Sequence, residues 1–163
     1  LTSAICFVKK DVFENLKGFN LNLFPGEDPE FFFRAKKQGY KIIYSPEIFI
    51  YHRRRPTLKG LCKQFSNYGS TRVKELKILN EKIKFIYLMP SLFFIYFILV
   101  IPLSFFEIYF VLPLLIYILF VIFASLKQII IYKDPKSIFL LPFIYPLIHL
   151  SYGYGLIKGL IKN

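Results

Sequence analysis

Two long apolar runs without a charged residue dominate the second half of the chain. The first covers residues 85–106 and the second covers residues 108–126, with Glu107 as the one charge between them. At about 1.5 Å per residue, a helix of either length can span a hydrocarbon core of about 30 Å. A soluble domain would need far more chain than these 163 residues to cover two such helices. We therefore predict a transmembrane hairpin whose turn lies near Pro102 and Glu107.

A third apolar run, residues 138–157, is less regular because it contains Pro142, Pro146 and the sequence SYGYG. Pro and Gly interrupt backbone hydrogen bonding that lipid cannot replace, so the run could cross the bilayer or dip in and return. We predict a third span here, although Lys158 and Lys162 at its end favour the cytosolic face. Residues 85–163 are thus expected to form the membrane region.

Basic residues orient these spans. The chain carries 22 Lys and Arg against 10 Asp and Glu, a net charge of +12. Lys and Arg are concentrated before the first run and in the link 127–137, whereas the link between the first two runs has neither. Because cytosolic loops of membrane proteins are rich in Lys and Arg, residues 1–84 and the link 127–137 are expected to be cytosolic. The protein is then a multi-pass protein of the cytoplasmic membrane. Because this bias explains the charge and no recognition motif accompanies it, we expect membrane lipids as partners and no nucleic acid.

Residues 58–84 have a helical pattern with two different faces. We predict basic interfacial helices that lie on an anionic membrane surface. The apolar face repeats at helical spacing through Leu58, Leu61, Cys62, Phe65 and Tyr68, and the polar face carries Lys59, Lys63, Gln64 and Asn67.

The pattern of the first 57 residues predicts part of an α/β domain. Asp11 and Glu14 resemble a capping box that opens a helix over about 12–17, which Gly18 ends. Asp28 is predicted to cap a second helix over 29–38, with Pro29 at its first position and Gly39 after its end.

Two strands are expected next, over YKIIYS (40–45) and EIFIYH (47–52), with a turn at Pro46. The predicted fold class is therefore α/β in residues 1–57, followed by an α-helical membrane domain. Because the chain starts at Leu1 rather than Met, we expect it to be the C-terminal part of a longer protein. Cys6 and Cys62 have no spacing typical of a disulfide framework or a zinc site.

An ordered set of motifs resembles a known family. In GFNLNLFPGEDPEFFFRAKKQGYKIIYSPEIFIYHRRR, a Gly-Phe pair precedes an acidic Glu-Asp pair, a helix with an Arg, a Gly-Tyr pair and a strand ending in His. This order resembles the second half of the catalytic domain of family 2 glycosyltransferases, which have the GT-A fold. RRRPTLKGLCKQFSNYGSTR, the apolar runs and HLSYGYGLIKGLI resemble the membrane-anchored bacterial branch that builds exopolysaccharide and related surface glycans. The resemblance covers nearly the whole chain.

The resemblance implies that a sugar passes, with inversion, from a nucleotide-sugar donor to a lipid-linked or glycan acceptor. The acceptor hydroxyl must lose its proton as it attacks, which requires one carboxylate as general base. By its place in the motif this base is Asp28, with Glu27 as its companion. A divalent cation, Mg²⁺ or Mn²⁺, can stabilise a diphosphate leaving group. We expect the cation to be held mainly by the donor-binding half with its DxD motif, which this sequence lacks, so that the chain alone is inactive.

Further binding residues are suggested by the same resemblance. His52 is a candidate for binding the metal or the diphosphate, and Arg53, Arg54 and Arg55 suit phosphate. Gln64 and Arg72 are similar to the Gln and Arg of the QxxRW motif of processive members, although their spacing differs and the chain has no Trp.

Each candidate has a purely structural alternative. Asp28 could serve only as a helix cap, and His52 could be a structural histidine. Arg34 is expected to form a salt bridge with Glu30 one helical turn earlier. The arginines at 53–55 could anchor the membrane surface, and Gln64 and Arg72 could belong simply to an interfacial helix.

An alternative function also stays open. The chain could be a small multi-pass membrane protein for transport or assembly of surface glycans, with His149 and neighbouring tyrosines lining a path. Polar residues inside apolar helices support such a role in general.

Overall fold

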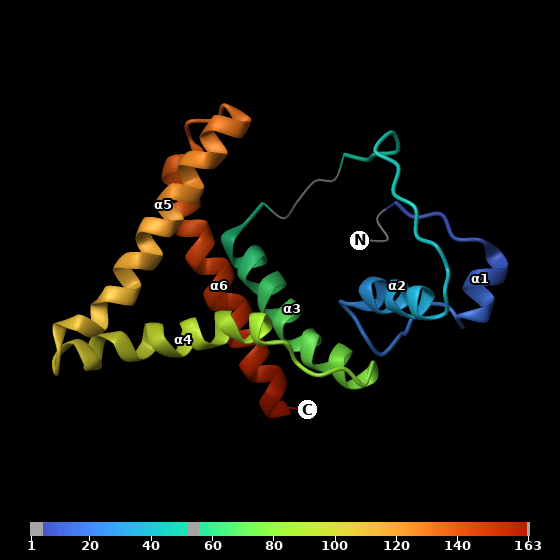
Figure 1. Cartoon of the computed structure of the whole chain (residues 1–163), viewed down its shortest axis with the longest axis horizontal. Helices are drawn as coiled ribbons and strands as arrows, with labels where there is room; N and C mark the ends of the chain where they lie inside the picture. Colours follow the sequence, from blue (N-terminus) through green and yellow to red (C-terminus); the bar gives the residue numbers. More distant parts are fainter. Residues whose placement is uncertain (1–4, 52–55, 163) are drawn as a thin grey trace.

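The computed structural model describes residues 5–51 and 56–162, and helices account for most of them (Figure 1). The elements are α1 (Lys10–Asn15), α2 (Glu27–Lys37), α3 (Leu58–Ile78), α4 (Phe85–Ser104), the 3-10 helix η1 (Ile108–Val111), α5 (Leu112–Tyr132) and α6 (Ser137–Lys162). Helices α1 and α2 form a small unit at one end of the molecule, and the longer helices form the rest.

The prediction of an α/β part was wrong. Over the described residues the chain forms no strand, and residues 40–51 lie between α2 and α3 without regular structure apart from a turn at Pro46 and Glu47. Their apolar side chains point into solvent, with Ile43 88% and Tyr51 96% exposed. The β-branched and aromatic residues of this segment favour a strand, but a strand also requires a neighbouring chain segment for its backbone hydrogen bonds. No described segment supplies that neighbour.

Helix α1 was predicted in the right place with the wrong start. It begins at Lys10, and no side chain caps its first turn, so the capping box of Asp11 and Glu14 is not formed. Its end is a left-handed closure in which Lys17 and Gly18 both have positive φ, 58° and 64°. The amide of Gly18 donates to the carbonyl of Phe13 at 2.9 Å, which satisfies one of the free carbonyls of the last turn.

Helix α2 starts two residues before the prediction. Its N-cap is Gly26, at φ 132°, so Asp28 lies inside the first turn and is not the cap. Pro29 is tolerated there because the first amides of a helix have no intrahelical partner. At the other end, Gly39 has φ 84° and the amide of Tyr40 donates to the carbonyl of Ala35 at 3.0 Å, which closes the helix as predicted.

The core of this first unit lies between α1 and α2. It is centred on the buried side chains of Leu16, Phe31 and Ala35. The ring of Phe31 contacts those of Phe13 and Phe19 at centroid distances of 5.7 and 5.0 Å. These aromatic contacts fix α2, and therefore its acidic first turn, against α1.

The three apolar runs are all helical, and three helices are long and apolar enough to cross a membrane by length and composition: Phe85–Ser104, Ile108–Tyr132 and Ser137–Lys162. They form the sides of a triangle (Figure 1). Helices α4 and α5 diverge from their short connection, and α6 runs from the end of α5 back to the beginning of α4. There the hydroxyl of Ser91 in α4 donates to the carbonyl of Gly153 in α6 at 3.2 Å.

Helices α3 and α6 lie against each other in parallel, at the closest helix contact of the fold. A Cβ atom added at Gly155 would overlap the carbonyl oxygen of Ser66, and one added at Gly159 would lie 2.7 Å from that of Ser70. Ser66 and Ser70, like Gly155 and Gly159, are four residues apart and share a helix face. This is the small-xxx-small arrangement that lets two backbones approach closely.

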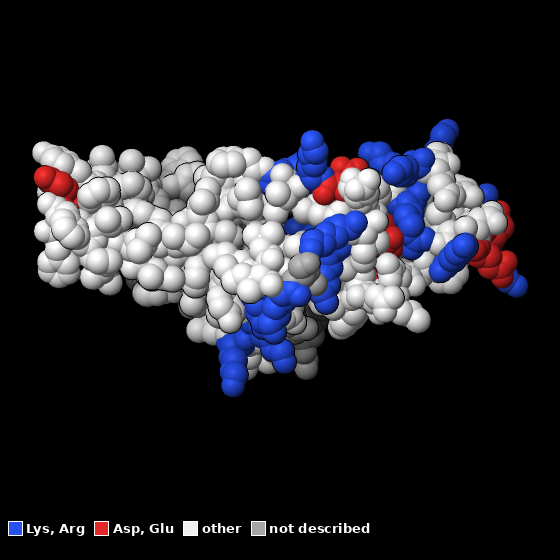
Figure 2. All heavy atoms as spheres, turned by 90° about the horizontal axis from the view of Figure 1, so that it is seen from below, with Lys and Arg blue, Asp and Glu red and all other residues white. Residues whose placement is uncertain are grey.

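Charges are segregated along the molecule. Figure 2 shows Lys and Arg concentrated in the middle of the molecule and toward the end that holds α1 and α2, whereas the face drawn at the opposite end is white apart from one acidic patch. This separation in space agrees with the separation along the sequence.

Candidate functional site

The acidic first turn of α2 brings together Glu27, Asp28 and Glu30. The free amides and the dipole of a helix N-terminus favour negative charge at this position. Oε2 of Glu27 accepts a hydrogen bond from the backbone amide of Gly26 at 2.8 Å, which stabilises the glycine cap. Asp28 is half-buried, and its Oδ1 is shielded from solvent. Glu27 and Asp28 are thus consecutive residues in the first turn of the helix.

Glu30, by contrast, belongs to the interior. Its side chain is 2% exposed, and its carboxylate receives two bonds from Arg34, at 2.6 Å from Nε and 2.9 Å from Nη2. Nη2 of Arg34 also donates to the carbonyl of Gly18 at 2.7 Å, and Nη1 donates to the carbonyl of Leu16. The predicted salt bridge between Glu30 and Arg34 is confirmed, and Arg34 uses its donors to join α2 to the end of α1 instead of facing a ligand.

The acidic turn rests on α3. A Cβ atom added at Gly26 would lie 3.0 Å from Cγ2 of Thr71, and Thr71 itself is buried. The positive φ of Gly26 and this close approach both call for a residue without a side chain. This contact places the start of α2 beside the middle of α3, at the residue that precedes Arg72 in the sequence.

Arg72 lies where α3, α4 and α6 converge. Nη1 donates to Oε2 of Glu75 at 2.5 Å, and the guanidinium carbon lies 4.9 Å from the centroid of the Tyr87 ring at the start of α4. From α6, Tyr152 interacts with the same guanidinium. These four residues, Arg72, Glu75, Tyr87 and Tyr152, form what we call the polar junction.

The electrostatics of the polar junction centre on Glu75, which is 5% exposed. Burial raises the pKa of its carboxyl above the usual range, the neighbouring Arg72 opposes this rise, and Glu30 of α2 adds to it. This effect connects Glu75 with Glu30, the buried member of the first turn of α2.

Gln64 is not part of the polar junction. It lies eight residues before Arg72, about 12 Å along the helix axis. Its Nε2 donates to the hydroxyl of Tyr68 at 2.6 Å, one turn further along α3. Of the pair that resembles the QxxRW motif, the structure therefore brings only Arg72 close to the acidic turn.

His52, Arg53, Arg54 and Arg55 lie outside the described residues, so their predicted roles stay predictions. Among residues 5–51 and 56–162, no three His, Cys, Asp or Glu side chains come together as a group that could hold a metal ion.

The sequence reasoning did not single out Thr71, Glu75, Tyr87 or Tyr152. One signal was available for part of this arrangement, because Gly155 and Gly159 form a GxxxG pattern that indicates close helix packing. Ser66 and Ser70 form a matching small-residue pattern in α3, which indicates α3 as the helix that packs against α6. That packing brings Tyr152 of α6 to Arg72 of α3.

Comparison with known proteins shows the family to which the chain belongs. Residues 2–158 match the model of glycosyl transferase family group 2. A curated relative from Methanococcus voltae, dolichyl N-acetyl-alpha-D-glucosaminyl phosphate 3-beta-D-2,3-diacetamido-2,3-dideoxy-beta-D-glucuronosyltransferase, is 29% identical over 147 residues, which cover 89% of this chain and 42% of the relative. The chain thus spans less than half the length of the relative that it matches. No solved structure matches. Since the family model covers nearly the whole chain, the protein belongs to glycosyl transferase family group 2.

Proposed function

We propose that the chain is the acceptor-side part of a membrane-anchored glycosyltransferase that moves a sugar from a nucleotide-sugar donor to a lipid-linked acceptor with inversion. The family match supports transfer of a sugar. The name of the Methanococcus voltae relative describes an acceptor in which a sugar phosphate is attached to dolichol. Because the chain spans 42% of that relative, the whole reaction is a proposal for this chain.

One observation carries the choice of a lipid-linked acceptor. The acidic turn rests on α3 at Thr71, next to the polar junction where α3 meets the apolar helices α4 and α6. An acceptor whose lipid lies in the bilayer presents its sugar just above the membrane surface. Its hydroxyl would therefore arrive at the level of Glu27 and Asp28.

The chemistry assigned to the acidic turn is proton removal. A carboxylate oxygen of Asp28 takes the proton of the acceptor hydroxyl while the hydroxyl oxygen of the acceptor attacks the anomeric carbon of the donor sugar. The nucleoside diphosphate leaves from the opposite side of that carbon. Glu27 is bonded to the amide of Gly26 and orients the acceptor or the base. Arg53, Arg54, Arg55 and His52 are proposed to contact the diphosphate. A divalent cation, Mg²⁺ or Mn²⁺, is proposed to be held mainly outside the described residues.

The test introduces two carboxylate substitutions into the proposed longer protein that includes the donor-binding half, in native membranes supplied with labelled nucleotide sugars and membrane lipids. Asp28→Asn keeps the size of the side chain and removes the base, so we expect sugar transfer to fall by a factor of about 10² to 10⁴. The control, Glu81→Gln, changes an exposed carboxylate in the link after α3 and should leave transfer unchanged. Equal turnover of the Asp28→Asn protein and the native protein would contradict the assignment.

The transport alternative stays a prediction. The described side chains at its centre pack together: the hydroxyl of Tyr117 lies 2.8 Å from Nδ1 of His149, and the ring of Phe93 lies 4.3 Å from that of Tyr117. This packing does not favour an open path. Flux across liposomes that contain only this chain would support the alternative.

A further inference from the structure

We propose that α6 lies along the cytosolic surface of the membrane, beside α3, and that only α4 and α5 cross the bilayer. The partner of the α3–α6 pair is then the headgroup region of an anionic bilayer. This inference replaces the third span expected from the sequence, and it does not depend on the proposed sugar transfer.

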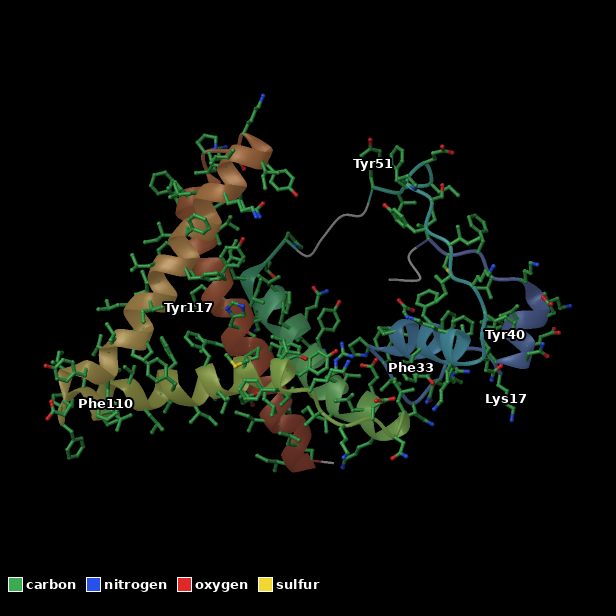
Figure 3. All side chains as sticks on the ribbon, in the orientation of Figure 1. Lys17, Phe33, Tyr40, Tyr51, Phe110 and Tyr117 are labelled. Atoms are coloured by element: carbon green, nitrogen blue, oxygen red, sulfur yellow. The ribbon has the colours of Figure 1, made fainter. Side chains whose placement is uncertain are left out.

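The first argument comes from the two ends of α6. A helical hairpin that crosses a bilayer and returns has its first and last residues on the same face. Helix α6 starts directly after α5, and its Gly153 accepts a hydrogen bond from Ser91, near the beginning of α4. It therefore joins the two ends of the hairpin that lie on one face. In Figure 1, α6 closes the open side of the triangle, and Figure 3 places Phe110 at the opposite corner.

The second argument comes from α3. Residues 66–73 of α3 run parallel to residues 152–159 of α6 in backbone contact, so these two segments share one depth. Helix α3 carries several ionisable side chains that are costly to place in hydrocarbon. They are Lys59, Lys63, Arg72, Lys74, Glu75 and Lys77. If α6 crossed the bilayer, these charges would have to enter it together with α6.

The third argument is the distribution of charge around α6. Basic side chains lie at both of its ends and before α4, whereas the far corner of the triangle carries the acidic Glu107. The basic residues are Lys82, Lys84, Lys133, Lys136, Lys158 and Lys162. A single span would place its two ends on opposite faces, but here both ends match the anionic cytosolic leaflet.

The two faces of α6 also fit a position between the hairpin and α3. His149 reaches toward the hairpin, where the hydroxyl of Tyr117 meets its Nδ1. Gly155 and Gly159 face α3 instead. Exposed apolar side chains, among them Phe139, Phe143 and Leu160, remain to enter the lipid interface.

The test determines on which side of the membrane a single introduced cysteine is accessible. Each cysteine is introduced into the complete protein, in which Cys6→Ser and Cys62→Ser remove the native thiols. Lys63→Cys, Glu107→Cys, Asp134→Cys and Lys162→Cys each replace an exposed residue. A membrane-impermeant maleimide is applied to intact cells and to inside-out vesicles, and solubilised samples give full labelling. We expect Glu107→Cys to be labelled from outside, and the other three only from the cytosolic side.

Lys162→Cys decides between the two arrangements. Three spans require it to be labelled from the same side as Glu107→Cys, which would overturn the proposal. Labelling of Lys162→Cys only after solubilisation would also overturn it, because the end of a surface helix is accessible to water. Neither result would bear on sugar transfer, since the readout does not involve activity.

Discussion

The guanidinium of Arg34 donates two hydrogen bonds to the carboxylate of Glu30, one helical turn earlier in α2. Nε lies 2.6 Å from Oε1, and Nη2 lies 2.9 Å from Oε2. The same guanidinium donates to the carbonyls of Leu16 and Gly18 at the end of α1. The salt bridge predicted from the spacing of Glu30 and Arg34 therefore also joins α2 to the end of α1, and its carboxylate is buried. It holds in place the helix whose first turn carries Glu27 and Asp28.

Replacing Arg34 by Gln should loosen α2. The change leaves the buried carboxylate of Glu30 without its partner, and breaking such a pair costs about 3 kcal/mol or more. Hydrogen exchange of the α2 amides, measured by mass spectrometry in detergent micelles, should accelerate about a hundredfold if this loss opens the helix locally. Lys36→Gln, at an exposed position of the same helix, is the control. Unchanged α2 protection in the Arg34→Gln protein would show that the clamp contributes little.

A methyl group at Gly155 should separate α3 from α6. The added Cβ overlaps the carbonyl oxygen of Ser66, so one of the two backbones must move. Overpacking of this kind costs about 1 to 3 kcal/mol. The Gly155→Ala protein should therefore unfold at a lower temperature in micelles, whereas Lys158→Ala, at an exposed position of α6, should not. Identical melting of Gly155→Ala and the native protein would mean that the helices are less closely packed than described.

Glu75 should make stability depend on pH in an unusual direction. Burial raises the pKa of its carboxyl above 4.5, with Arg72 opposing and Glu30 adding to the rise. The folded chain therefore keeps this proton at pH values where the unfolded chain has lost it. The stabilisation is full below the unfolded pKa and is lost as the pH rises through the folded pKa.

The measurement compares the native protein with Glu75→Gln between about pH 4.5 and 7, using thermal unfolding in micelles. Lowering the pH should stabilise the native protein relative to the variant, because the variant has no group to protonate at this position. Glu81→Gln, which changes an exposed carboxylate, should follow the native protein. Parallel pH profiles for Glu75→Gln and the native protein would argue against a raised pKa.

Tyr117→Phe removes one hydrogen bond from the centre of the triangle while keeping the aromatic ring. The hydroxyl lies 2.8 Å from Nδ1 of His149, and hydrogen bonds between apolar helices are worth about 0.6 kcal/mol on average. We expect a destabilisation of that size in mixed-micelle unfolding. Tyr109→Phe, at a 77% exposed side chain, should have no effect. Equal stability of the two variants would indicate that the Tyr117 bond contributes nothing.

Local features were predictable from the sequence where neighbouring residues decide them. Pro29 and Gly39 marked helix α2, and the spacing of Glu30 and Arg34 predicted their ion pair. The start of α2 was misplaced because Gly26, whose φ is 132°, takes the cap position that Asp28 was expected to fill. The strands expected in residues 40–51 are not formed, because backbone pairing depends on a second segment that a local pattern cannot supply.

The sequence by itself determined the composition and length of the apolar helices, the segregation of charge, and the acidic motif at Glu27 and Asp28 that carries the family resemblance. Only the tertiary structure decided that this motif rests on Thr71, that Arg72 joins Glu75, Tyr87 and Tyr152, and that α6 runs back to the start of α4. The physical reason is that apolar length shows that a helix can enter a membrane but not in which direction it lies. That direction follows from contacts between distant residues, such as Ser66 with Gly155 and Ser91 with Gly153.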